Sequence, residues 1–427
     1  MPVWDKISKI WKLKDLRNKI LFVFALLVVF RAVAAIPVPG VDISRLKMFF
    51  DNNQLFGLIN VFSGGGMHNF SLVMMGVGPY ITSSIVMQLM TVIIPQVEKW
   101  YREEGEMGRR KFQQITRILT VPFALIQSYG MITLLKSQNV ITSLGGFELA
   151  RTIIIVTAGT MLLMWLGELI TEKGIGNGTS LIIFAGIITN IPGATQRTFS
   201  TWDPSQIFSY AIFVAVSLLV IAGVVFITEG QRNIPVTYAR RVSGRGMVSS
   251  SSYLPLRVNQ AGVIPIIFAL SILLFPRMIA NVIGVVGSDK VKDIALKVST
   301  FLQDKWVYGI MYFLLVVAFT FFYTTVTFEP TKVSENLQKQ GGYIPGVRPG
   351  RSTAEYLQRI LNRITLAGAL FLALIAVLPY IIQGFTHIQS VSIGGTSLLI
   401  AVSVALDSMK QIDSQLVMRD YDGFLRS

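Results

Sequence analysis

Long segments without charge are the feature that most restricts what this chain can fold into. A bilayer core of about 30 Å requires roughly 20 consecutive apolar residues for each helix that crosses it. Five segments meet this requirement with almost no charged residue inside, namely 20-37, 152-171, 207-228, 306-328 and 364-384. Charged residues make up only 14% of the 427 residues, whereas a soluble domain carries about 25%. The sequence therefore predicts a polytopic membrane protein and argues against a soluble multidomain enzyme.

Five further segments are apolar but are interrupted by Gly, Pro or polar residues. They are 70-95, 113-135, 179-192, 259-282 and 391-406, and the third is short for a full crossing. Small and polar residues in a span usually face the interior of a bundle or a wet cavity, so we expect these weaker spans to line the functional centre. The fold class expected is an all-α polytopic membrane protein with ten transmembrane helices.

The span count also predicts how the chain is divided. Five helices in 20-192 and five in 207-413 make two halves of inverted topology, joined by an external connection at 193-206. Most of the 38 basic residues then fall on the side that holds both termini, and the positive-inside rule makes that side cytoplasmic. We therefore expect a cytoplasmic N-terminal segment 1-19 and a cytoplasmic tail 414-427, in a multi-pass protein of a plasma membrane.

Two cytoplasmic loops, 229-258 and 329-362, are long and basic. In the first, Ile234, Val236 and Tyr238 alternate with other residues before the turn signal Ser243-Gly244-Arg245-Gly246, a pattern that predicts a hairpin. The basic residues of both loops fit positive-inside charge as well as a docking surface for an acidic partner.

The sequence has few of the residue types and none of the motifs that are typical of catalytic or metal sites. The chain has no cysteine and only two histidines, and it lacks a phosphate-binding loop, a zinc-protease helix and a Ser/His/Asp set, so we expect no enzyme, no cofactor and no metal site. Transporters driven by protons or cations usually need acidic groups at mid-membrane. Glu168 and Asp407 lie near the cytoplasmic ends of their spans, where they are either solvated carboxylates or parts of a proton relay.

Two apolar features have more than one interpretation. Segment 56-69 is too short to span and carries Gly64, Gly65 and Gly66 in succession, which suits a re-entrant element held inside protein or an interfacial helix. Segment 70-95 carries Val77, Ile81 and Ile85 at a spacing of four, which is typical of helix packing and also of a ring that closes a pore by dewetting.

Seven sequence blocks, on spans identified independently, resemble the SecY family of bacterial protein-conducting channels. They are PYITSSI at 79-85, preceded by FSGG at 62-65, IPVPGVD at 36-42, EGEMGRRK at 104-111, MWLGELITEKGIGNGTS at 164-180, AGVIPIIFA at 261-269, IPGVRPG at 344-350 and GGTSLLI at 394-400. The resemblance extends from about residue 15 to 415.

The resemblance implies a clamshell of two five-helix halves around an hourglass pore that is plugged outside and opens sideways to lipid. The family's pore-ring positions correspond to Val77, Ile81, Thr179, Ile183, Ile267 and Ile400, of which Thr179 departs from the usual bulky apolar residue. The plug within 56-69 corresponds to Ile59, Asn60, Val61, Phe62, Ser63, Gly64 and Gly65. The lateral gate corresponds to Thr82, Gln88, Thr91, Asn259, Gln260 and Phe275.

The same resemblance implies partners. Small membrane subunits like SecE and SecG accompany such channels, the SecA motor ATPase or the ribosome drives them, and signal peptides, nascent polypeptides and membrane lipid contact the gate. The motor- or ribosome-binding positions correspond to Arg240, Arg241, Arg245 and Arg348. The expected function is a passive channel that translocates unfolded secretory polypeptides and releases transmembrane segments into lipid. The alternatives are a secondary transporter of small solutes and a membrane insertase without a pore.

Overall fold

The computed structural model is a helical protein with one small sheet. It describes residues 10–38, 46, 66–67, 70–137, 140, 145–200, 207–241, 247–273, 276, 293, 297, 300–301, 304–386 and 390–426. The helices in chain order are α2 (Lys14–Ala34), α5 (Gly78–Ile93), α6 (Pro95–Arg102), α7 (Gly105–Ser137), α8 (Gly146–Lys173), α9 (Gly178–Ser200), α10 (Ile207–Glu229), α13 (Lys305–Thr327), α14 (Pro330–Lys339), α15 (Arg351–Thr386) and α16 (Ser390–Arg426). A further apolar helix spans Ile264–Leu273.

Every one of the ten predicted spans contains a described helix. Among the described residues, four stretches are long and apolar enough to cross a bilayer, Gly105–Lys136, Gly146–Lys173, Trp306–Lys339 and Arg351–Leu378, and the bent pair of α5 and α6 would be a fifth. These helices leave many large apolar side chains exposed, such as Ile154, Leu314 and Leu374. A helix that is apolar on its outer face is suited to lipid.

The predicted span 70-95 begins too early, while its end agrees with the end of helix α5 within two residues. Residues 70–77 form turns, with a positive φ of 57° at Gly76, and helix α5 begins only at Gly78 with a proline in its first turn. Proline is tolerated there because the first N–H groups of a helix have no intrahelical acceptor. Beyond Ile93 the chain bends by 108° into α6, which again has a proline in its first turn. The polar residues of α6 therefore leave the direction of the span.

The predicted external connection 193-206 is also partly helical. Helix α9 continues through Pro192 to Ser200, so that segment 179-192 is the first part of a helix of 23 residues.

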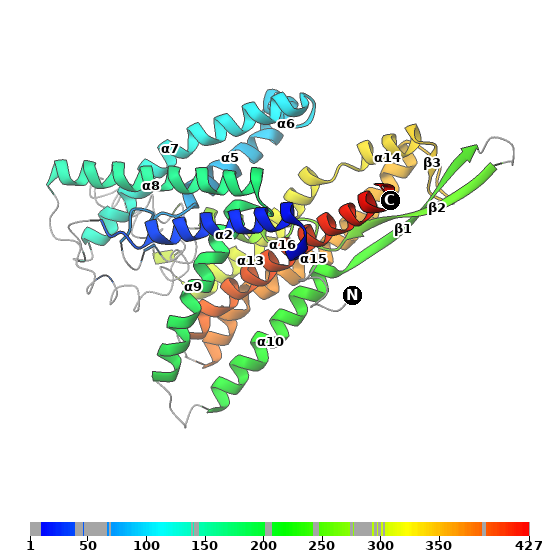
Figure 1. Cartoon of the computed structure of the whole chain (residues 1–427). Coiled ribbons are helices and arrows are strands. Elements are labelled where there is room, and N and C mark those ends of the chain that lie inside the picture. Colours follow the sequence, from blue (N-terminus) through cyan, green and yellow to red (C-terminus); the bar gives the residue numbers. More distant parts are fainter. Residues whose placement is uncertain are drawn as a thin grey trace.

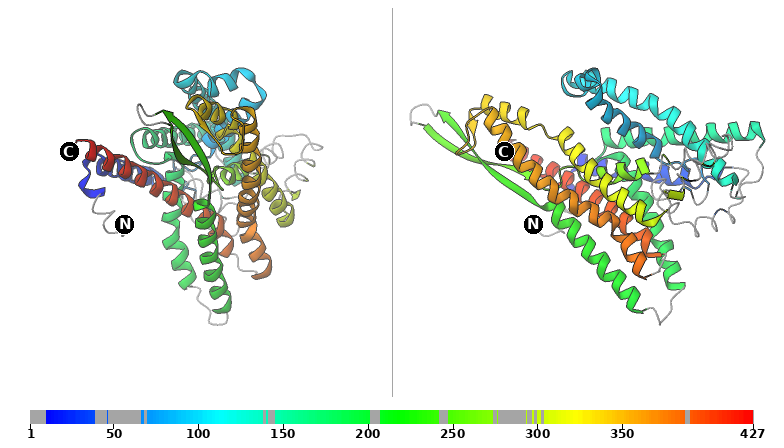
Figure 2. Two further views of the ribbon diagram at one scale, coloured as in Figure 1. Left: turned by 90° about the vertical axis from the view of Figure 1, so that its right-hand side faces the viewer. Right: turned by 180° about the vertical axis from the view of Figure 1, so that it is seen from behind.

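The helices gather in two groups. Helices α5, α6, α7 and α8 pack on one another on one side, and α10, α13, α15 and α16 pack on the other (Figures 1 and 2). Helix α9 contacts α8 of the first group, α16 of the second and the N-terminal helix α2. The largest hydrophobic cluster takes residues from both groups, so the apolar core lies where the two groups meet.

The predicted hairpin is confirmed. Strands β1 (Gln231–Arg241) and β2 (Met247–Arg257) pair antiparallel, and β3 (Gly342–Tyr343) adds to the other edge of β1. The strands project away from the helices beside α14 (Figure 1). Ile234 and Val236 pack on Leu337 of α14 and Leu357 of α15, which forms a second, separate core on this side. Apolar residues alternate along β1 because only one face of the sheet is covered.

Candidate functional site

Five of the six predicted ring residues lie in one hydrophobic cluster. Val77, Ile81, Ile183, Ile267 and Ile400 belong to the core between the two helix groups, and none is more than 6% exposed. They come from the start of α5, from α9, from the helix Ile264–Leu273 and from α16. Four separate elements thus contribute aliphatic side chains to this large cluster. A ring of aliphatic side chains around a constriction can close a pore by dewetting.

Thr179 lies in a different environment. Its hydroxyl donates to Asn177 Oδ1 at 2.6 Å, and the same oxygen accepts the N–H of Ser180 at 3.2 Å, as is usual at the start of a helix. A side chain on Gly167 of α8 would lie 3.2 Å from Thr179 Cγ2, so this methyl group faces α8.

The sequence also offers Ile187, a β-branched residue of the span 179-192, as a candidate beside the family's ring positions. It is 3% exposed and belongs to the same cluster as Ile183, one helical turn further along α9. Ile183 and Ile187 have the same spacing of four as Val77 and Ile81, and that repeated spacing was the available signal. Thr179, Ile183 and Ile187 share one face of α9 at a spacing of four, and because Ile183 and Ile187 are buried while Thr179 is half-buried, burial favours Ile187 over Thr179 as a ring residue.

The predicted gate residues lie on both helix groups and form hydrogen bonds within their own group. Gln127 of α7 donates to the Thr82 hydroxyl at 3.2 Å, Thr91 donates to the carbonyl of Gln88 at 2.6 Å, and Asn259 donates to the carbonyl of Gly262 at 3.2 Å. Gln260 is half-buried beside Asn259, and Phe275 lies outside the described residues.

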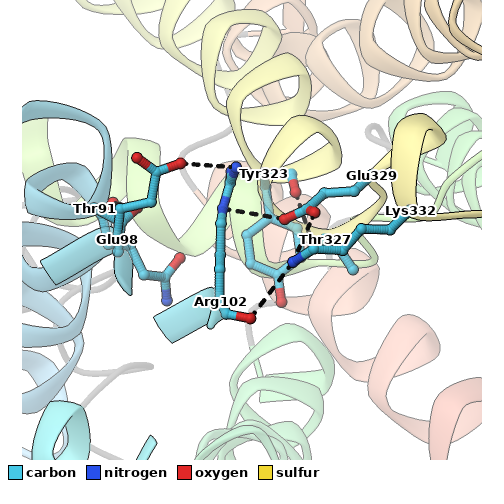
Figure 3. A network of polar contacts seen from close by, with 8 residues as sticks. Thr91, Glu98, Arg102, Tyr323, Thr327, Glu329 and Lys332 are labelled. Carbon is cyan, nitrogen blue, oxygen red and sulfur yellow. Dashed lines mark hydrogen bonds and ion pairs between the residues drawn. The ribbon is translucent and has the colours of Figure 1, made fainter. Parts of the chain in front are cut away.

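An ion pair joins the two groups at one end of the gate helices. Arg102, the last residue of α6, places Nε 3.1 Å from Oε1 of Glu329, which directly precedes α14. Arg102 also pairs with Glu98 at 3.0 Å, and Lys332 pairs with Glu329 at 2.9 Å. Figure 3 shows these four side chains next to Thr91 on one side and Tyr323 and Thr327 on the other.

The predicted plug residues Ile59, Asn60, Val61, Phe62, Ser63, Gly64 and Gly65 lie outside the described residues. The chain directly after them is anchored. Met67 and Phe70 are buried against Met131 and Leu135 of α7, and the N–H of Val38 donates to the carbonyl of Phe70 at 2.8 Å.

The predicted docking arginines lie in the sheet region. Arg240 and Arg241 end β1, opposite Val248 and Met247, and Arg245 lies outside the described residues. Arg348 is exposed in the turn between β3 and α15, where its carbonyl accepts the Thr353 hydroxyl at 2.9 Å. Positive φ values of 81° at Gly346 and 96° at Gly350 show why glycine flanks this arginine, since other residues rarely adopt that conformation.

The two carboxylates considered for a proton relay face basic groups. Glu168 Oε1 lies 2.7 Å from Nε of Arg117. Asp407 follows the predicted span 391-406, and the pKa of its carboxyl is raised, chiefly because the group is buried. The nearby charges of Lys410 and Arg257 lower this pKa, and that of Glu229 raises it. The ion pair of Glu168 fits the structural interpretation, whereas the burial of Asp407 does not fit a solvated carboxylate.

Comparisons with known proteins agree with this geometry. A SecY family model matches residues 71–409, which is more than half of the chain. The chain belongs to the SecY family. It is 45% identical to the protein translocase subunit SecY of Halalkalibacterium halodurans, over 98% of this chain and 99% of that protein. The protein of the same name from Thermotoga maritima is 41% identical, over 99% of this chain and 98% of that protein.

Solved structures share the fold of this SecY family member. The structure described as "The structure of a protein conducting channel" has a TM-score of 0.63 at 18% identity, covering 92% of this chain and 90% of that chain. "Sec61 in the Canine ribosome-channel complex from the endoplasmic reticulum" gives a TM-score of 0.60 at 16% identity, over 92% and 90% of the two chains. These matches confirm the all-α clamshell expected from the sequence.

Proposed function

We propose that this chain is the channel subunit of a Sec translocase, which conducts unfolded polypeptides across a membrane and releases transmembrane segments sideways into lipid. The observation that carries the proposal is the cluster of aliphatic side chains from four elements at the meeting of the two helix groups, in a member of the SecY family. A ring of this kind grips a passing chain without binding any particular side chain, because it offers apolar contact and no hydrogen-bond donor or acceptor.

The parts of the channel follow from this proposal. The pore ring consists of Val77, Ile81, Ile183, Ile187, Ile267 and Ile400, with Thr179 outside it. Residues 56–69 form the plug, and the gate opens between α5 and α7 on one side and the helix Ile264–Leu273 and α13 on the other. The halves 20–192 and 207–413 move relative to each other about the connection at 193–206.

The partners and the orientation are part of the same proposal. The side of the sheet and α14 is cytoplasmic, as are both termini, and the membrane is the bacterial inner membrane. Arg240, Arg241, Arg245 and Arg348 face SecA or the ribosome, since guanidinium groups can form paired hydrogen bonds with phosphates and carboxylates. Small subunits like SecE and SecG cover part of the lipid-facing surface. Motion of the polypeptide is driven by these partners, and the chain itself catalyses no reaction.

A photocrosslinking amino acid at Ile81 tests the proposal. During arrested translation of a secretory protein, we expect this probe to crosslink to the nascent chain. The matched control is the same probe at Ile154 of α8, which is 64% exposed on the outer surface and should crosslink to lipid. Equal labelling of the nascent chain from both positions, or from neither, would contradict a central path. Membership of the SecY family gives no support to the small-solute transporter.

A further inference from the structure

The outer edge of strand β2 is open to a further strand. The sheet order is β2-β1-β3, so among the described strands β2 is paired on one side only. The ladder with β1 continues past the strand ends, where the N–H of Val258 donates to the carbonyl of Gly230 at 2.9 Å. In an antiparallel pair, alternate residues direct both of their backbone groups to the partner strand. The even-numbered residues of β2 therefore face β1, and the odd-numbered residues direct their N–H and C=O groups outward.

The positions of the prolines agree with this assignment. Pro255 has no N–H, and its odd number places it on the outer edge, where no hydrogen bond to β1 is lost. Pro235 of β1 lies in the same way on the edge of β1 that faces away from β2. Before Pro255, the outward N–H groups of β2 belong to Met247, Ser249, Ser251 and Tyr253.

The sequence of β2 does little to protect this edge from pairing. Natural edge strands usually carry charged side chains, bulges or prolines that keep another chain away. Apart from Pro255, segment 247–256 has none of these, because it contains no charged residue and pairs with β1 residue for residue. The hairpin projects away from the helices (Figure 1), and Tyr253 is 66% exposed. An open edge of this kind is suited to binding an extended backbone by strand addition.

Strand β2 also leads to the proposed pore. It ends at Arg257, and residues 258–263 connect it to the helix Ile264–Leu273, which carries the ring residue Ile267. A strand added antiparallel to β2 would have its N-terminal end beside Arg257 and its C-terminal end beside Met247. A polypeptide whose N-terminal part has already entered the pore has this direction. The edge thus matches the substrate in polarity as well as in chemistry.

We propose that the outer edge of β2 binds a segment of the unfolded polypeptide substrate as an added antiparallel strand, which aligns the substrate with the pore before it enters. This inference rests on the proposed function. Backbone hydrogen bonds are common to all sequences, so the edge accepts substrates that share no side-chain motif. Each such bond contributes only modestly in water, so the added strand dissociates and the substrate moves on.

A photocrosslinking amino acid at Tyr253 identifies what occupies the edge. The assay uses vesicles that contain the chain and its small subunits, supplied with SecA, ATP and a secretory precursor that a folded C-terminal domain arrests during translocation. We expect a crosslink to the precursor. A crosslink to SecA or to a second copy of this chain in its place, or no crosslink, would overturn the proposal. The same probe at Ile81 separates the two failures: without a crosslink there the proposed function fails, and with one there but none at Tyr253 only the edge site fails.

Replacement of Ser251 by proline tests whether the backbone makes the contact. Ser251→Pro removes one outward N–H and leaves the bonds to β1 in place, since proline is tolerated on an edge. We expect the crosslink from Tyr253 to the precursor to fall about threefold to tenfold. The controls are Ser251→Ala, which keeps the N–H, and Asn233→Pro, on the edge of β1 away from β2 and outside its pairing with β3. Both should crosslink as the wild type does, and equal crosslinking in Ser251→Pro and Ser251→Ala would overturn the proposal.

A change in the precursor tests the same contact with an unaltered channel. In one precursor, alternate residues of the segment that is arrested outside the pore are replaced by proline, and in the matched precursor the same residues are replaced by alanine. The proline precursor lacks the N–H groups that an added strand requires, so its crosslink from Tyr253 should be about threefold to tenfold weaker than that of the alanine precursor. Equal crosslinking of the two precursors would refute strand addition, whatever the channel variants show.

Discussion

Replacement of Ile187 by Asn tests whether this residue or Thr179 completes the pore ring. Ile187 is 3% exposed among the ring residues, whereas Thr179 hydrogen-bonds to Asn177 at the start of α9. The amide of an asparagine in the ring would form hydrogen bonds with water and so favour entry of water into the closed constriction. We therefore expect Ile187→Asn to raise the ion leak of the closed channel. Thr179→Asn, which creates the same side chain two turns earlier, should not.

The size of the effect follows from the burial of Ile187. Burying an isoleucine side chain contributes about 1.5–3 kcal/mol. We take about half of this burial free energy as the contribution of Ile187 to keeping the closed constriction dry. Its loss lowers the free energy of the water-filled constriction relative to the dry one by about 1 kcal/mol, which corresponds to roughly a fivefold rise in ion leak. Ile187→Leu keeps the side chain apolar and of similar volume, so its leak should remain within about twofold of the wild type.

The assay is single-channel conductance in planar bilayers, with residues 58–66 deleted so that the plug does not mask the ring. Thr179→Ile serves as a further control and should leave the conductance of this deleted channel unchanged. The reasoning is refuted if Thr179→Asn raises the leak while Ile187→Asn leaves it unchanged, because α9 would then direct its first turn to the pore. If neither variant alters conductance, the cluster is ordinary helix packing.

Three further predictions concern the other proposed parts. Deleting 58–66 alone should leave translocation active but make the resting channel leaky in planar bilayers, and an unchanged resting conductance would point to an interfacial helix. Arg348→Glu should slow motor- or ribosome-driven export while the protein still inserts and folds, and Arg348→Lys should recover part of the rate because the charge returns without the planar fork. Asp407→Asn should remove a pH dependence of thermal stability. Burial raises the pKa of this carboxyl in the folded state, so the stability it contributes is fully present below the ordinary pKa near 4 and declines as pH rises through the raised value. A melting temperature that falls equally with pH in Asp407→Asn and in the wild type would disprove this.

The sequence predicted a helix in each of the ten spans, though not where α5 begins, where α9 ends or the helix α14, because spans in a bilayer must satisfy every backbone hydrogen bond internally and must be apolar over about 20 residues. It also predicted the hairpin from the alternation of Ile234, Val236 and Tyr238, since a sheet covered on one face repeats every two residues. The SecY family was likewise recognisable, because its blocks are local in sequence. All three properties depend on residues close together along the chain.

Only the tertiary structure decided which side chains meet. Thr179, Ile183 and Ile187 share one face of α9, and a sequence does not determine which turns of that face are buried against neighbouring helices. The bend after Ile93 redirects Arg102 toward the other helix group, and the pair with Glu329 joins residues more than 200 positions apart. From the sequence, a basic residue at a helix end, such as Arg102, is explained by the positive-inside rule alone, because its partner is not known. The partner of Arg102 comes from packing between the two halves, and that packing depends on the whole fold.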